Sequence, residues 1–261
     1  IYGVMIIVNF AHGEFLMLGI YVAFWAFTLF GADPYLVIPV ALVLVFGLGA
    51  LIQRGLVQRV LDAHPLNQII LLVGVSTLLM GLAQFFFSAD PKSIHVSYET
   101  EVLSAFGLRF SIPRLIAFFA SILISSLLYL FLHYTRTGKA IRAVSQSRDA
   151  ARLMGINVNF IYYLTFGIGA GITAVAGVLL APNHTMIPTM GQGYSVIAFV
   201  VVVLGTMGNF FGAFLGGLII GIVEAFAGFY LGGDVKIIAS MMIFILILLF
   251  KPAGLFGRKR S

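Results

Sequence analysis

Few residues of this chain are placed to do catalytic chemistry. The five histidines fall in five separate segments, at His12, His64, His95, His133 and His184. The sequence contains neither an H-E-x-x-H pair for zinc nor a G-x-S-x-G turn for a serine nucleophile. It also contains no cysteine, which excludes a disulfide framework and a thiolate metal site. We therefore expect a protein that is not an enzyme, with no catalytic residues, no metal and no cofactor.

One glycine-lysine pair partly matches a phosphate-binding loop but lacks two of its residues. Such a loop has the pattern G-x-x-x-x-G-K-[ST], in which the backbone and the lysine hold the phosphates. Here Gly138-Lys139 is followed by Ala140, and the position of the first glycine holds His133. Any work driven by ATP is therefore expected to be done by another chain.

Two acidic residues in apolar stretches require a physical explanation. A charged side chain at mid-bilayer costs at least about 2.5–3.5 kcal/mol on insertion scales. Glu224 either lines a polar path or contacts a partner, or it is a protonated or paired carboxyl that orients helices. Glu14 belongs to a polar cluster with Asn9 and His12, near an expected helix break at Gly13. The cluster either offers the backbone groups of a helix terminus to a substrate or lies at the membrane interface.

The composition indicates that these residues are embedded in a membrane protein. Hydrophobic residues make up 61% of the 261 residues, charged residues only 9%, and the mean hydropathy is +1.10. Soluble domains contain about 25% charged residues, so this chain could not cover a globule with a solvated surface. Long continuous apolar runs favour helices over a barrel, whose strands would alternate. The net charge of +6 does not indicate nucleic-acid binding, because the basic residues lie in short loops.

The apolar runs predict an all-α, polytopic transmembrane helix bundle with about eight spans. A span needs about 20 mostly apolar residues. The expected helices are Phe15–Phe30, Tyr35–Ile52, Pro65–Ser88, Ile112–Tyr134, Phe160–Ala181, Tyr194–Met207, Phe211–Leu231 and Val235–Phe250. The first and sixth are short, either because they are broken helices around a substrate path or because their boundaries are misplaced. The chain opens at Ile1 inside an apolar run, so we expect a truncated N-terminal span. All 261 residues are assigned to one transmembrane domain.

The loop charges predict the orientation of the bundle. Eleven of the fifteen Lys and Arg residues lie on one side if the spans alternate, in the loop after Ile52, in the loop of residues 135–159 and in the C-terminal tail. The positive-inside rule places that side in the cytoplasm. The loop Ala89–Ser111, which has mixed charge, is then extracytoplasmic.

Paired small residues indicate close packing between these helices. Glycines four residues apart occur at Gly167 and Gly171, at Gly212 and Gly216, and at Gly217 and Gly221. Each pair lies on one helix face, and in lipid this arrangement lets two backbones approach closely. The pairs predict a packed bundle and carry no information about the substrate.

The cytoplasmic loop of about residues 135–159 contains the strongest candidate for a docking site. Residues 142–154 are expected to form one short amphipathic helix, and Gly155 is expected to end it as a C-cap. Ala150 and Ala151 are small enough to let another surface approach, and Asp149 and Arg152 surround them with charge. From the residues alone, the loop is either a docking site for another chain or a solvated connection between helices.

Several blocks of the sequence resemble branched-chain amino-acid ABC permeases of the LivH type. The matching blocks are residues 9–14 (NFAHGE), 140–155, 199–208, 217–225 and the tail 251–257 (KPAGLFG). They cover essentially the whole chain in order. The chain departs from the family in lacking most of the usual first span, and it carries Asp149 where the general importer loop has glutamate.

The resemblance implies a bacterial inner-membrane permease that works with several partners. A second permease subunit, identical or different, completes the pathway, two ATP-binding subunits dock on the cytoplasmic side, and a periplasmic binding protein delivers the amino acid. The coupling helix would then contain Asp149, Ala150, Ala151, Arg152 and Gly155. Leucine, isoleucine and valine are the expected substrates, with urea or short-chain amides as the alternative. A different class, an ion-coupled secondary transporter, would need intramembrane acidic residues for a relay, and a membrane scaffold would transport nothing.

Overall fold

The computed structural model describes residues 1–5, 7–105, 108–232, 235–251 and 254–257, and this part of the chain is almost entirely helical. In chain order the elements are α1 (Tyr2–Met5), α2 (His12–Phe30), η1 (Pro34–Val37), α3 (Ile38–Gly55), η2 (Val57–Val60), α4 (Pro65–Phe87), β1 (Val102–Ala105), β2 (Leu108–Ser111), α5 (Ile112–Tyr134), α6 (Arg136–Gln146), α7 (Arg148–Leu153), α8 (Val158–Leu180), η3 (Ala181–Asn183), α9 (Met190–Leu204), α10 (Phe210–Tyr230) and α11 (Val235–Phe250). The expected all-α fold is confirmed, with one added hairpin.

All eight expected spans are helices in the structure. Within the described residues, six helical segments are long and apolar enough to cross a membrane, and α9 and α11 are shorter apolar helices. The first span begins at His12, three residues earlier than expected, so its apparent shortness was a boundary error. The sixth, α9, has 15 residues and remains short. The total of about eight spans stays a prediction.

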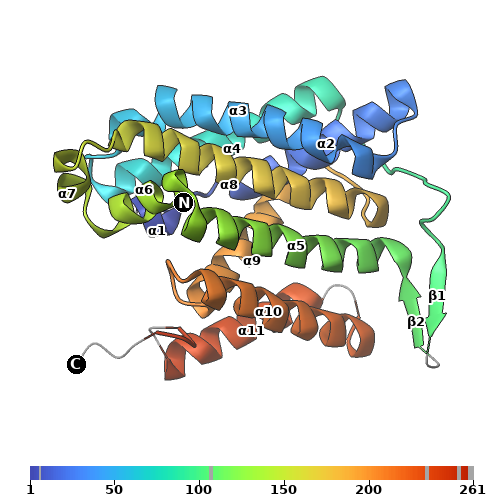
Figure 1. The fold of residues 1–261 in the computed structure, drawn as a ribbon. Helices are drawn as coiled ribbons and strands as arrows, with labels where there is room; N and C mark the ends of the chain where they lie inside the picture. The colour runs from blue at the N-terminus through green and yellow to red at the C-terminus, as the bar shows by residue number, and fades with distance from the viewer. Residues whose placement is uncertain (6, 106–107, 233–234, 252–253, 258–261) are drawn as a thin grey trace. The chain divides into compact units, whose positions relative to one another are not determined.

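The chain divides into two compact units, one formed mainly by residues 3–192 and the other mainly by residues 193–261. In the first unit α3 and α8 lie side by side, with α6 and α7 beyond one end of α8 and the β1–β2 hairpin beyond the far end of α5 (Figure 1). In the second unit α10 packs against α11 and the end of α9. The assignment of all residues to one transmembrane domain remains a prediction.

Small residues make the helix contacts of the first unit. A side-chain carbon added at Gly19 of α2 would collide with the backbone oxygen of Ala174 in α8, and one at Gly177 would collide with that of Leu16. On the opposite side of α8, carbons added at Gly167 and Gly171 would meet α3 within 3.0 Å. In lipid, close contact of this kind supplies the association energy that hydrophobic burial supplies in water.

The predicted glycine pairs are therefore partly confirmed. The pair Gly167 and Gly171 packs against α3, and in the second unit Gly212 and Gly216 lie against Gly205 and Val201 at the end of α9. A carbon added at Gly221 would meet no other atom within 4 Å. The pair formed by Gly217 and Gly221 thus makes no close helix contact within its unit.

The expected single helix over residues 142–154 is wrong, because the chain breaks at Ser147. Ser147 has extended backbone angles, φ −157° and ψ 118°, and its hydroxyl accepts a hydrogen bond from the Ala150 N–H at 3.2 Å. A serine in this geometry is an N-cap, which satisfies a free amide at the start of a new helix. The result is two helices, α6 and α7, with α7 free to point in its own direction.

Polar contacts join three connections of the first unit, namely those after α2, α4 and α8. The Tyr98 hydroxyl donates a hydrogen bond to Asp33 Oδ2 at 2.7 Å, and the Tyr98 ring stacks on Tyr35 at 5.6 Å. Burial, together with the hydrogen bond to Asp33 and its charge, raises the pKa of the Tyr98 phenol, so it stays a neutral donor at physiological pH. Lys92 and Met186 form a backbone bridge that adds the connection after α8.

We expect Gly177→Ala to destabilise the protein, because the added methyl collides with the Leu16 carbonyl and must push α2 away from α8. Overpacking of this kind costs about 1–3 kcal/mol. The measurement is thermal unfolding in detergent. Gly74→Ala in α4 is the matched control, since a methyl there meets nothing within 4 Å. Equal melting temperatures for the two variants would contradict the packing argument.

Candidate functional site

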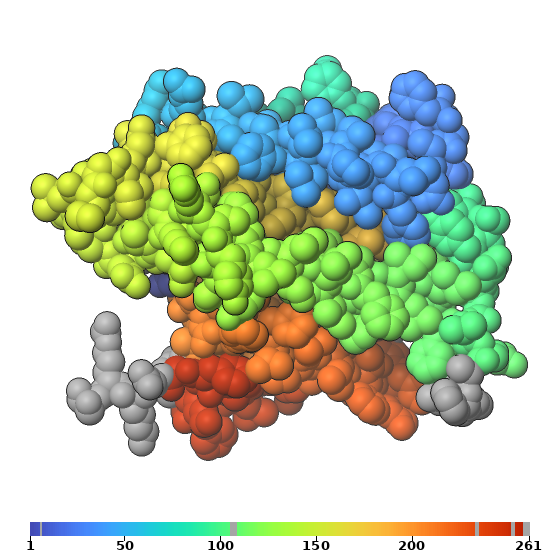
Figure 2. Space-filling model, in the orientation of Figure 1, coloured from blue at the N-terminus to red at the C-terminus, as the bar shows by residue number. Residues whose placement is uncertain are grey.

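A short projection formed by α6, α7 and the turn after them lies beside the start of α8, at one end of the first unit. Its location on the cytoplasmic side stays a prediction. Figure 2 shows the residues around α7, yellow-green to yellow, extending beyond the neighbouring helices of that unit. Of the five predicted coupling residues, Asp149, Ala150, Arg152 and Gly155 are exposed. Ala151 is only 3% exposed and packs into the hydrophobic core with Val158 and Ile161. Ala151 therefore joins α7 to the core, whereas the other four face outward. The role of all five residues in coupling stays a prediction.

Gly155 ends α7 as expected from the sequence. Its φ of +80° lies in the left-handed region, and its N–H donates to the Arg152 carbonyl at 3.0 Å. The Ile156 N–H donates to the Ala151 carbonyl at 3.0 Å, which closes the helix end. A residue with a β-carbon is strained in this conformation, so glycine is needed for the chain to turn back into α8.

Two apolar residues at the tip of the projection were missed by the sequence reasoning. Leu153 is 89% exposed and Met154 is 82% exposed, directly before the Gly155 turn. Large apolar side chains presented to water on a polar loop indicate a surface that another protein covers. The signal available in the sequence was the pair Leu153-Met154, directly before the helix-ending Gly155, in a loop otherwise rich in basic residues.

The charges around this tip are mainly basic. Arg136, Lys139 and Arg142 of α6 are exposed, as is Arg152 of α7. The one nearby acid on the projection, Asp149, lies 3.8 Å from Arg152, in an exposed pair that contributes little stability. An apolar tip with a basic surround fits an apolar pocket that has acidic residues near its edge.

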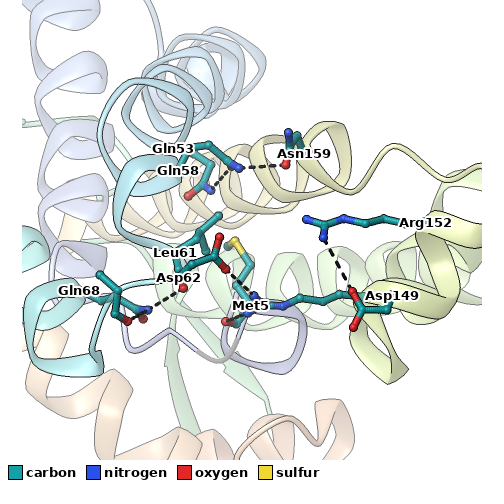
Figure 3. Close-up of polar contacts among 11 residues, drawn as sticks. Met5, Gln53, Gln58, Leu61, Asp62, Gln68, Asp149, Arg152 and Asn159 are labelled. Atoms are coloured by element: carbon teal, nitrogen blue, oxygen red, sulfur yellow. Dashed lines mark hydrogen bonds and ion pairs between the residues drawn. The ribbon is translucent and has the colours of Figure 1, made fainter.

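Amide side chains join the loop between α3 and α4 to the first turn of α8, next to the projection. Gln58, in η2, donates from Nε2 to Asn159 Oδ1 at 2.9 Å, and Asn159 lies at the start of α8 (Figure 3). Gln53, fully buried at the end of α3, donates to Gln58 Oε1 at 3.4 Å. These contacts fix the loop between α3 and α4 beside the first turn of α8.

A second candidate site is the buried polar cluster at the start of α2. Glu14 is fully buried, and its Oε1 accepts a hydrogen bond from the Ser76 hydroxyl of α4 at 3.0 Å. Its Oε2 has no hydrogen-bond partner among the described residues. A carbon added at Gly191, at the start of α9, would lie 2.6 Å from the carboxyl carbon of Glu14. The Glu14 carboxyl is thus inside the protein, whereas Asn9 and His12 are half-buried, and Glu14 leaves no room for a larger residue at position 191.

The other members of the cluster have different surroundings. Asn9 accepts a hydrogen bond from the Ala11 N–H at 3.0 Å, which shapes the turn before α2, and its Nδ2 has no partner among the described residues. The ring Nε2 of His12 lies 2.8 Å from the Thr173 hydroxyl of α8. His12 and Glu14 therefore contact different helices, and the structure does not join them into one catalytic group.

Glu224 belongs to the second unit, and its side chain has a hydrogen-bond partner there. Its Oε1 accepts a hydrogen bond from the fully buried Ser240 hydroxyl of α11 at 3.0 Å. The contact joins α10 to α11, as expected for a carboxyl that orients helices. Among the described residues there is no group of three or more side chains suited to hold a metal ion.

Comparison with known proteins shows the family to which this chain belongs. Residues 1–250 match the family model described as "Branched-chain amino acid transport system / permease component". The chain is 33% identical to the high-affinity branched-chain amino acid transport system permease protein BraD of Pseudomonas aeruginosa, and 32% identical to the corresponding protein LivH of Escherichia coli. Each alignment covers 99% of this chain and 88% of the relative. A probable LivH of Methanocaldococcus jannaschii is 30% identical over 95% of this chain and 82% of its own. No solved structure matches significantly.

We expect Ser76→Ala to destabilise the first unit, because it removes the hydrogen-bond donor to the buried Glu14 carboxyl. Leaving a buried polar group without a partner costs about 1–3 kcal/mol. Thermal unfolding in detergent measures the effect. Thr77→Val is the matched control, since Thr77 is exposed and bonds only to the Val73 carbonyl of its own helix. A control as unstable as Ser76→Ala would show that the contact with Glu14 is not the cause.

Proposed function

Because the chain belongs to the family of permease components of branched-chain amino acid transport systems, we propose that it translocates leucine, isoleucine and valine through the cytoplasmic membrane as part of an ATP-driven importer. The observation that supports this proposal most directly is the family match over residues 1–250. The protein is a multi-pass membrane protein and the permease component of such a system. This role agrees with the expectation that it is not itself an enzyme.

The proposed assembly contains several further subunits. Two ATP-binding subunits supply the energy, a second permease subunit, identical or different, completes the pathway, and a periplasmic binding protein delivers the amino acid. The sequence supports separate ATP-binding subunits because Gly138-Lys139 lacks the rest of a phosphate-binding loop. The basic residues of the projection support a cytoplasmic partner with acidic residues at its docking groove.

Docking is proposed to use the exposed side of α7 and the turn after it. Leu153 and Met154 would enter an apolar pocket, Asp149, Ala150 and Arg152 would contact its edge, and Gly155 would set the angle of the tip. Ala151 would act from inside by holding α7 on the core. Closure of the ATP-binding subunits would then move the projection, and with it the helices of the membrane unit.

The polar residues within the membrane are proposed to lie along the translocation path or to orient its helices. Asn9, His12 and Glu14 lie where the chain enters α2. The burial of Glu14 and the contacts of Glu14 with Ser76 and of His12 with Thr173 support a role in setting the position of α2. The pairing of Glu224 with Ser240 likewise supports an orienting role for that residue.

Two alternatives differ in the cargo or the energy source. Urea or short-chain amides would use the same architecture with a different binding protein. An ion-coupled transporter is not favoured, because residues 1–250 match a family of permease components of transport systems. The alignment with the relative BraD covers 99% of this chain.

We expect ATP-dependent uptake of labelled leucine in vesicles that contain this chain and its co-purifying partners. Unlabelled isoleucine and valine should compete, and urea should not. Uptake of urea in place of leucine would keep the importer and change its substrate class. Uptake that does not depend on ATP, or no uptake of any of these solutes, would contradict the proposal.

We expect the double substitution Leu153→Gln with Met154→Gln to weaken binding of the ATP-binding subunits. Loss of a central apolar anchor costs about 2 kcal/mol or more, which is about thirtyfold in affinity. Co-purification with the tagged permease measures it, and Gln146→Ala, at an exposed polar position of α6, is the control. Unchanged co-purification of the glutamine double variant would exclude the tip as the anchor.

The combination of Gly155→Pro and Ala151→Arg is also expected to abolish docking. It would act by disrupting α7, because Ala151 is buried and Gly155 has a positive φ.

A further inference from the structure

Arg148 differs from the other basic residues of the cytoplasmic loop in pointing inward. It is the first residue of α7, and its side chain is 34% exposed, against 58% for Arg152 one turn later. Arg152 pairs only with Asp149 on its own helix. The two arginines therefore have different surroundings although they belong to the same short helix.

The Arg148 guanidinium contacts three separate parts of the first unit. Nη1 lies 3.5 Å from Asp62 Oδ1, in the loop between α3 and α4. Nη2 donates a hydrogen bond to the Met5 carbonyl at 3.4 Å. The guanidinium carbon lies 5.5 Å from the centre of the Tyr162 ring in α8, which is cation–π distance. Figure 3 shows Asp62 and Met5 close to one another.

These three contacts lead to the membrane helices that pack most closely. Met5 ends α1, four residues before the Asn9 turn that opens α2. Asp62 follows η2, whose Gln58 is bonded to the start of α8. Tyr162 is 2% exposed inside α8 itself. A planar guanidinium can hold a carboxylate, a carbonyl and a ring at once, which a lysine ammonium cannot do with the same geometry.

We infer that Arg148 is a positioning residue that transmits movement of α7 to the entry of α2, the α3–α4 loop and α8, and so couples ATP hydrolysis to transport. This inference rests on the proposed function. Arg148 does not contact the partner in this scheme, so its loss leaves docking intact. The buried Ala151 keeps α7 attached to the core. Its methyl group makes no directional contact, so it cannot orient α7 toward the entry of α2 and the α3–α4 loop.

The test uses the complete complex in proteoliposomes, with binding protein, labelled leucine and ATP. Co-purification, ATP hydrolysis and uptake are measured for Arg148→Gln, Arg148→Lys, Asp62→Asn and the control Arg54→Gln, at an exposed position in the last turn of α3. The amount of leucine taken up per ATP should fall by about tenfold in Arg148→Gln, as expected when an ion pair and a cation–π contact are both lost. Co-purification should not change. Arg148→Lys should lie between Arg148→Gln and wild type, Asp62→Asn should show a smaller fall, and Arg54→Gln should match wild type.

The outcomes separate this inference from the proposed function. If the wild-type complex shows no ATP-dependent leucine uptake, the proposed function fails. If the wild type transports and Arg148→Gln keeps the wild-type ratio of uptake to hydrolysis, or if Arg54→Gln falls equally, the inference is overturned. If Arg148→Gln does not fold, as judged by gel filtration, Asp62→Asn decides, because that side chain is 94% exposed and not needed for packing. An unchanged ratio in Asp62→Asn would then overturn the inference.

Discussion

The close approach of α2 and α3 to α8 is the interaction on which the first unit depends. Lipid tails are as apolar as the helix surfaces, so association in a membrane requires backbones that come close enough for dispersion contacts. Gly19 and Gly177 allow α2 to touch the backbone of α8, and Gly167 with Gly171 allow α3 to do so on the other side. Two helices, α2 and α3, are therefore held through α8.

Polar residues inside both apolar units lie where they connect one helix to another. Glu14 connects α2 to α4 through Ser76, His12 connects α2 to α8 through Thr173, and Glu224 connects α10 to α11 through Ser240. An unpaired polar group costs more in hydrocarbon than at a surface, so each pair also excludes other positions of its two helices. Glu14 Oε2 is one of several buried polar atoms without a hydrogen-bond partner among the described residues, and it lies beside Gly191, which no larger residue could replace without moving the carboxyl.

The projection combines an outward and an inward side on the six-residue helix α7 and the residue after it. Leu153 and Met154 are exposed, whereas Ala151 and Arg148 join the helix to the core. This division follows from the break at Ser147, which gives α7 a direction independent of α6. A single continuous helix over residues 142–154 would place the apolar tip and the basic anchor at other angles, and the contacts with Met5 and Asp62 would be lost.

The sequence by itself determined the class, the helices and the family. Hydropathy reports local transfer into lipid, so it located all eight apolar helices, and Ile112–Tyr134 and Val235–Phe250 were predicted with the observed bounds. Gly155 was identified because a positive φ is a property of one residue. Only the tertiary structure decided which side of α7 is outward and that Ala151 is buried. It also decided that Glu14 contacts Ser76 and that the loop of residues 89–111 contains a hairpin. These features depend on contacts between residues such as Arg148 and Met5, which are 143 positions apart. No local pattern of residue types records which distant segments will meet.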